Sequence, residues 1–183
     1  MKKYEFTGET KEIKLLFRTA VLHRIRATVS FGFVKIGDLG GWIEKEENLS
    51  HEGKAWVCGD AEVCGDAKVC GDAEVCGDAE VCGDAKVWGN AEVCGDAKVF
   101  SASHVLVIGA IGSRNDFTTF YRDKDNEITV KCGCFLGKID RFLEKVTQTH
   151  GDSKYALVYR AAVEVAKLQI DLSGEAPKDA DEE

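Results

Sequence analysis

The sequence predicts a mainly β protein with a repetitive core, and three observations support this fold class. Residues 53–100 repeat a six-residue unit, residues 1–36 are rich in β-branched and aromatic residues, and helical periodicity begins only at Ile139. The chain has 183 residues, of which 44% are hydrophobic and 31% charged, as in a globular domain with a buried core. No apolar run reaches the roughly 18 residues of a membrane span, and no apolar segment follows the basic start, so we expect a cytoplasmic protein.

The six-residue unit is defined by its columns. Ala recurs at every sixth position from Ala55 to Ala97 and Val from Val57 to Val99. Gly and then Asp, or once Asn90, lie two and three positions after each Val from Val57 to Val93. Because side chains alternate along a strand, Ala-x-Val points two small apolar side chains inward. Gly-Asp supplies a bend with permissive backbone angles. Each unit is therefore one short strand followed by one corner.

This pattern resembles the hexapeptide repeat of left-handed parallel β-helices, in which an aliphatic residue recurs every six positions and a small residue lies four positions later. Val57 with Ala61, and Val63 with Ala67, match it. The resemblance implies that three units form one triangular coil of eighteen residues. It covers residues 49–105, which makes about three coils, and both ends need caps because each coil contacts only its neighbours.

The flanks of the repeat are expected to supply these caps. In the N-terminal part, "YEF" is followed by a turn at "TGET" and by further strands up to "VLHRIRATVSFGFV". After the repeat, "FTTFYR" and "EITVKC" flank the turn "DKDN", which predicts a β-hairpin. The predicted segments are a basic β cap (1–36), the short left-handed parallel β-helix (37–112), a loop and β-hairpin (113–134), two α-helices in a helical hairpin (135–172) and a disordered acidic tail (173–183).

Two amphipathic helices are predicted in the helical hairpin. The first carries its apolar stripe from Ile139 to Val146, and His150-Gly151 is the expected stop. The second carries its stripe from Tyr155 to Ile170. These stripes must be buried, either on the open end of the β-helix or on a second copy of the chain, and we expect a homodimer in the second case.

Six cysteines occupy the outward position after the inward Val: Cys58, Cys64, Cys70, Cys76, Cys82 and Cys94. In a cytoplasmic protein these should be reduced thiols, and stacked side chains point in parallel, which disfavours a disulfide. A flat row of thiols does not converge on a metal as tetrahedral zinc ligands do. Because Trp88 and Phe100 share the same column, we predict a packing role and no metal. Cys58, Cys76 and Cys94, which eighteen-residue coils place in one row, form the alternative metal site.

The net charge of −8 is unevenly distributed. Residues 1–35 hold eight Lys or Arg against three Glu (+5), residues 36–100 five against fifteen acidic residues (−10), and residues 101–183 eleven against fourteen (−3). A basic end can contact nucleic acid, and a loop on a rigid scaffold often carries function. The partner-binding candidates are Lys14, Arg18, Arg24, Arg26, Arg114, Asp116 and Arg122. The acidic-face candidates are Asp60, Asp78, Asp96, Glu74 and Glu92.

No catalytic residues are expected. Many hexapeptide-repeat β-helix proteins are acyltransferases that use a histidine base, or carbonic anhydrases that hold zinc with three histidines. Here His51 and His104 lie at opposite ends of the repeat, and no insertion interrupts it to form a substrate pocket. We therefore predict a non-enzymatic binding protein without a cofactor. An acyltransferase-like enzyme and a thiol-rich metal-binding or structural scaffold are the alternatives.

The segments "LHRIRATVSFGFVKIGDLGGWIEKEENLSHEGKAWV" and "IGSRNDFTTFYR" extend a second resemblance over nearly the whole chain. They resemble small proteins of phages and prophages in gut Firmicutes, some of which are anti-CRISPR inhibitors of Cas9. The resemblance implies a phage-encoded inhibitor of a host nucleic-acid-targeting defence. Its expected partner is a host protein, specifically a Cas9–guide RNA complex in the bacterial cytoplasm, and the basic N-terminal region is expected to contact nucleic acid.

Overall fold

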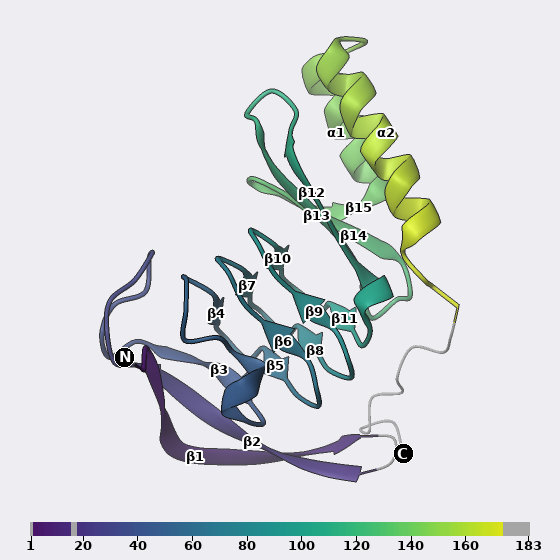
Figure 1. Ribbon diagram of the computed structural model, residues 1–183. Helices are drawn as coiled ribbons and strands as arrows, with labels where there is room; N and C mark the ends of the chain where they lie inside the picture. Colours follow the sequence, from purple (N-terminus) through teal and green to yellow (C-terminus); the bar gives the residue numbers. More distant parts are fainter. Residues whose placement is uncertain (1, 16–17, 174–183) are drawn as a thin grey trace.

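The computed structural model describes residues 2–15 and 18–173, and the predicted acidic tail from residue 174 onward lies outside them. An N-terminal β-hairpin, a parallel β-solenoid and an antiparallel sheet covered by two helices follow one another along the chain (Figure 1). The predicted mainly β fold is therefore confirmed. Within the described residues, neither α-helix is long and apolar enough to cross a membrane.

The solenoid is built from short strands, each paired in parallel with the strand one coil later. Trp56 pairs with Glu74 and Glu74 with Glu92, so the coil repeats every eighteen residues as predicted. Its three sheets are β3-β5-β8-β11, β4-β7-β10 and β6-β9. The strands are β3 (Leu39–Ile43), β4 (Trp56–Val57), β5 (Glu62–Val63), β6 (Lys68–Val69), β7 (Glu74–Val75), β8 (Glu80–Val81), β9 (Lys86–Val87), β10 (Glu92–Val93) and β11 (Lys98–Val99).

The Ala and Val columns form the inside of the solenoid. The Ala residues from Ala55 to Ala97 and the Val residues from Val57 to Val99 are buried in one continuous core. The glycine column allows neighbouring coils to approach at the corners. Gly71 has a φ of +75°, and a Cβ added there would lie 2.9 Å from the backbone nitrogen of Gly89. A larger residue at this corner would therefore force the two coils apart.

The N-terminal hairpin consists of β1 (Tyr4–Leu15) and β2 (Arg18–Ala27), and β2 extends the first sheet by pairing antiparallel with β3. The predicted turn at "TGET" is wrong. The strand continues through this segment with a register shift between Phe6 and Thr10, because Gly8, at a φ of +93°, absorbs the irregularity. β2 also ends earlier than the predicted strand, and Phe31 bridges back to Val34 in a tight turn.

The first coil is closed by polar and aromatic side chains. Asn48, in the 3₁₀-helix η1 (Glu46–Asn48), is fully buried, and its amide group donates to the carbonyl oxygens of Gly65 and Ala67 at 3.1 and 2.9 Å. Tyr4 and Trp56 are buried in the same core. The end of the solenoid is thus capped by groups that satisfy its exposed backbone carbonyls.

The C-terminal sheet begins after η2 (Ala102–His104) and has the order β12-β13-β14-β15, all antiparallel. The predicted hairpin is confirmed as β13 and β14, and residues 105–111 belong to this sheet rather than to the parallel coils. The elements are β12 (Val105–Ile111), β13 (Asp116–Arg122), β14 (Ile128–Cys132), β15 (Phe135–Lys138), α1 (Ile139–His150) and α2 (Lys154–Gln169).

The two predicted helices are confirmed, but they do not cover the open end of the solenoid. They pack on one side of the C-terminal sheet, where Phe120 and Val130 meet Phe142 and Val163 in a second core. The opposite side of the sheet caps the solenoid, because Tyr121 alternates with Phe120 and joins the solenoid core. The sheet therefore lies between the coils and the helices (Figure 1).

Candidate functional site

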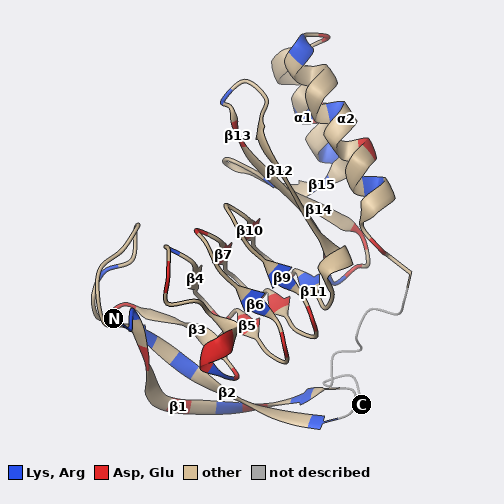
Figure 2. Cartoon of the chain, viewed as in Figure 1, with Lys and Arg blue, Asp and Glu red and all other residues tan. Residues whose placement is uncertain are grey.

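The outward positions of the solenoid form three faces that differ in what covers them. The closed face is the outer side of β5, β8 and β11, with Glu62, Cys64, Glu80, Cys82, Lys98 and Phe100. The thiol face is the outer side of β4, β7 and β10, with Trp56, Cys58, Glu74, Cys76, Glu92 and Cys94. The lysine face is the outer side of β6 and β9, with Lys68, Cys70, Lys86 and Trp88, and its lysines stand out in Figure 2.

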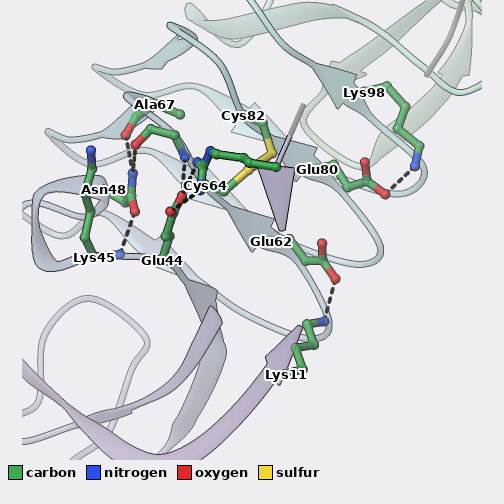
Figure 3. The surroundings of a disulfide bond; sticks show 12 residues. Lys11, Glu44, Lys45, Asn48, Glu62, Cys64, Ala67, Glu80, Cys82 and Lys98 are labelled. Atoms are coloured by element: carbon green, nitrogen blue, oxygen red, sulfur yellow. Dashed lines mark hydrogen bonds and ion pairs between the residues drawn. A yellow bond between two sulfur atoms is a disulfide. The ribbon is translucent and has the colours of Figure 1, made fainter. Parts of the chain in front are cut away.

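The closed face is covered by the N-terminal hairpin and contains a disulfide (Figure 3). Leu22 of β2 is fully buried against Cys64 and Cys82, with Ile13 and Leu15 packed around them. Cys64 and Cys82 form a disulfide across adjacent coils, with Cα atoms 4.6 Å apart. The expectation of reduced thiols is therefore wrong for this pair. The physical reason is that the hairpin turns an outward slot into a buried one and holds both side chains beneath it.

The same hairpin is fixed to the closed face by charge. The Nζ of Lys11 lies 2.6 Å from Glu62 and 4.6 Å from the centroid of the Trp42 ring, and Lys98 pairs with Glu80. Lys98 and Glu80 are paired residues of the neighbouring strands β11 and β8. The carboxylates of this face are thus matched by cations at short range, and they are not offered to a partner.

The thiol face keeps its cysteines free. Cys58, Cys76 and Cys94 stack in the predicted row, and none of them is in a disulfide. Cys58 and Cys76 are half-buried, whereas Cys94 is buried beneath the C-terminal sheet. Close contact with the Cys58 and Cys94 thiols lowers the pKa of Cys76, and the same contacts together with burial raise the pKa of both neighbours. The central thiol is therefore the one that ionises most readily.

Glu74 completes a compact group with two of these thiols. The Sγ of Cys58 donates to Oε1 of Glu74 at 3.7 Å, and one ligand atom each from Cys58, Glu74 and Cys76 lies within 4.8 Å of the others. In the described part of the chain, these three residues form the group of His, Cys, Asp or Glu side chains whose ligand atoms lie close enough together to hold a metal ion. Burial, followed by the charges of Cys76 and Glu92, raises the pKa of the Glu74 carboxyl.

The position of the Glu74 carboxylate beside the thiols was not predicted from the sequence, although strand alternation and the coil length indicate it. Glu74 and Cys76 flank the inward Val75, so strand alternation places both on the outer side of β7. The eighteen-residue coil then brings Cys58 from the coil before alongside them. A row of thiols alone does not converge on a metal, but the Glu74 carboxylate between two of them completes a group that does.

The acidic edge, defined as Asp60, Asp78 and Asp96, follows the thiol face at its corner. These residues stack because Gly59, Gly77 and Gly95 pack on one another, and Asp60 donates its backbone N–H to Gly77 at 3.1 Å. All three aspartates are exposed. Arg24 lies 3.4 Å from Asp60 and Lys124 lies 2.8 Å from Asp96. The edge is therefore a row of exposed carboxylates with a largely buried cation, Arg24, at one end and an exposed cation, Lys124, at the other.

The predicted basic patch on the N-terminal strands is dispersed by the fold. Arg18 forms a bidentate pair with Glu44, at 2.5 and 2.7 Å, and Arg26 pairs with Glu5 at 2.6 Å. Arg24 lies over the Trp42 ring, 5.0 Å from its centroid. Lys14 is exposed. Three of the four candidate cations therefore contact groups of this same chain, although Figure 2 shows the hairpin rich in Lys and Arg.

The polar-loop candidates separate into two places. Arg114 and Asp116 are exposed and line a hollow of about 290 Å³ between the sheet and the helices, together with His150 and Tyr159. Arg122 is buried, with Nη1 3.4 Å from Nε2 of His104. The fold therefore does not bring Arg122 to the surface beside Arg114.

Both histidines near the ends of the repeat accept backbone hydrogen bonds. Nδ1 of His51 accepts from the backbone of Lys3 at 3.2 Å, and Nδ1 of His104 accepts from that of Phe100 at 3.1 Å. Burial lowers the pKa of each imidazole, and Arg122 lowers that of His104 further. These contacts are those of two structural histidines at the two ends of the solenoid.

The comparisons with known proteins add no family to this description. No model of a protein family matches the chain, and no curated protein matches its sequence. The fold and the candidate site define the chain as a capped parallel β-solenoid protein with an acidic edge beside a face of free thiols.

Proposed function

We propose that the protein is a non-catalytic binding protein that presents its acidic edge to a positively charged surface of a partner. The observation that carries this proposal is the stacking of Asp60, Asp78 and Asp96 along one corner of a rigid scaffold. Neighbouring coils lie about 4.8 Å apart, and like charges at such spacing destabilise one another. A cationic partner relieves this repulsion, which favours binding.

The ion pairs at the ends of the edge do not prevent such binding. The carboxylate of Asp60 is 74% exposed in its pair with Arg24, and that of Asp96 is 47% exposed in its pair with Lys124. Exposed ion pairs contribute only about 0–1 kcal/mol. A partner's arginines can therefore replace these contacts at little cost in free energy.

The specific form of the proposal is a phage-encoded inhibitor of a Cas9–guide RNA complex, and it rests on the resemblance of the whole chain to phage and prophage proteins. Effectors of this kind hold nucleic acid in a positively charged channel and recognise it through its backbone. A regular row of carboxylates can compete with phosphates for such a channel. Binding of this kind weakens as salt rises.

The test is a pull-down and DNA-cleavage assay with purified Cas9–guide RNA complex. We expect the protein to bind and inhibit at low salt, and the triple substitution D60N, D78N and D96N to weaken both effects. The matched control is D66N with D84N, which removes carboxylates from the next corner of the same coils. Absence of both binding and inhibition would refute the Cas9 form. Equal loss in the control variant would show that the acidic edge is not the contact surface.

A further inference from the structure

We propose that Cys58, Cys76 and Glu74 on the thiol face form a binding site for a thiophilic divalent cation, with Zn²⁺ as the ion that this donor set fits best. The three ligand atoms lie within 4.8 Å of one another, and the Cys58 thiol already contacts the Glu74 carboxylate at 3.7 Å. Two thiolates and one carboxylate are ordinary zinc ligands, and soft sulfur donors select zinc over magnesium or calcium. The site is independent of the acidic edge.

The geometry requires only a small closure around the ion. Zinc bonds sulfur at about 2.3 Å, so two thiolates in a tetrahedron lie about 3.8 Å apart. Cys58 and Cys76 are on adjacent coils that are paired in register through β4 and β7. Both thiols are half-buried, so side-chain rotation suffices and the fourth ligand position can be taken by water. Binding requires both sulfurs as thiolates, so each thiol proton still bound goes to solvent. The two thiolates and Glu74 then balance the ion with one negative charge in excess.

Two other carboxylates stand between cysteines of adjacent coils, and neither is equivalent. Glu80 lies between Cys64 and Cys82, but those sulfurs form a disulfide and the carboxylate pairs with Lys98. Glu92 lies between Cys76 and Cys94, but Lys131 lies 2.6 Å from its carboxylate. On the lysine face, the residue between Cys70 and Trp88 in the next coil is Lys86. Glu74 thus differs from Glu80 in having two free thiols as neighbours, and from Glu92 in having a thiol as its close polar contact where Glu92 has Lys131.

The test uses the full chain with the Cys64–Cys82 disulfide intact and the other thiols free. It is freed of metal and titrated with Co²⁺ as a spectroscopic substitute and with Zn²⁺ in competition. We expect a thiolate-to-cobalt charge-transfer band that saturates at one ion per chain and is displaced by Zn²⁺. C58S and C76S should each lose the band, and E74Q should keep thiolate coordination with a lower affinity. Circular dichroism on each variant separates loss of binding from loss of fold.

Three controls make the assignment specific. C70S changes the same repeat position on the lysine face and should bind as wild type does. C94S and the double variant C132S/C134S should also bind normally, because their sulfurs lie outside the group of three. Binding that survives in folded C58S/C76S protein would overturn the proposal, as would the absence of a saturable band in wild type. Loss of the band in C94S would overturn the three-donor assignment.

Discussion

The closed face and the thiol face display the same column of the same six-residue repeat, yet their cysteines are in different chemical states. Cys64 and Cys82 lie beneath Leu22 of the N-terminal hairpin and form a disulfide. Cys58 and Cys76 lie on a side that the hairpin does not cover, and they remain free thiols beside Glu74. Within one solenoid, the packing of a distant segment therefore decides the chemistry of an outward position.

This contrast shows how a regular scaffold acquires distinct sites. The repeat places identical side chains at identical spacings, so the coils alone cannot distinguish one face from another. The distinction comes from the two caps, which meet different faces: β1 and β2 cover the closed face, while β13 and β14 reach the end of the thiol face. Four predictions test this division of the faces.

Truncation of Leu22, which covers Cys64 and Cys82, should destabilise the closed face more than any of the other three changes. Leu22→Ala leaves a cavity over Cys64 and Cys82, and we expect it to lower the free energy of unfolding by about 2–5 kcal/mol. Urea denaturation measures the loss, and thiol labelling under mild reductant should show the disulfide becoming more accessible. Val21→Ala is the control, because Val21 is 43% exposed on the opposite side of β2, and it should change stability by less than about 0.5 kcal/mol.

Loss of the disulfide should affect only the closed face. The Cys64–Cys82 bond closes a loop with a sequence separation of 18, so its removal in C64S/C82S should cost about 3 kcal/mol by restoring freedom to the unfolded chain. Guanidinium denaturation with and without reductant measures this. Reductant should destabilise wild type but leave the double variant unchanged. Equal sensitivity of both proteins would contradict the assignment of the disulfide to this pair.

One contact between the C-terminal sheet and the thiol face depends on a single oxygen, the hydroxyl of Tyr121. The hydroxyl of Tyr121 donates to the carbonyl of Cys94 at 2.9 Å and accepts from its N–H at 3.3 Å. Tyr121→Phe leaves both backbone groups buried without this partner, and we expect a loss of about 1–3 kcal/mol in thermal or chemical unfolding. Tyr155→Phe, at a 40% exposed site on α2, should have little effect.

The smallest expected effect is a pH dependence at the end of the closed face, where His104 accepts from the backbone of Phe100. Burial and Arg122 lower the pKa of His104, so the unfolded chain takes up this proton first as the pH falls. The stability contributed by neutral His104 is therefore complete above about pH 6.5 and is lost below it, by at most about 1.4 kcal/mol per pH unit. Unfolding curves from pH 7 to 5 should be flatter for His104→Asn, whose side-chain oxygen can accept the same hydrogen bond. An unchanged slope would show that His104 is not the group responsible.

Much of the fold follows from residue patterns in the sequence. The repeat columns, through their resemblance to hexapeptide-repeat β-helices, led to the coil length and to the stacking of Cys58 on Cys76, and the structure confirms both. The hairpin of β13 and β14 and the two helices were also predicted. These features rest on local alternation and on fixed spacing, which a sequence displays directly.

The errors lie where distant segments meet. The hairpin signal at "TGET" was local, but Gly8 permits a bulge, and the strand continues so that the hairpin can reach along the coils. The apolar stripes of the helices do not show from sequence which surface they pack against. The C-terminal sheet that covers them has two apolar sides, with Phe120 toward the helices and Tyr121 toward the coils. The homodimer stays a prediction. The apolar residues that α2 exposes are Leu157, Val165 and Leu168.

The solenoid can be predicted from the repeat alone, because a six-residue period with small inward side chains and a glycine at each corner is compatible with few other structures. Which cysteines are bonded, which are free and which carboxylate lies beside them depends on the packing of the caps on the coils. The physical reason is that the repeat gives every outward slot the same local surroundings. Covering by Leu22, ion pairing by Lys131 and the approach of Cys58 to Glu74 are all contacts between residues far apart in the chain.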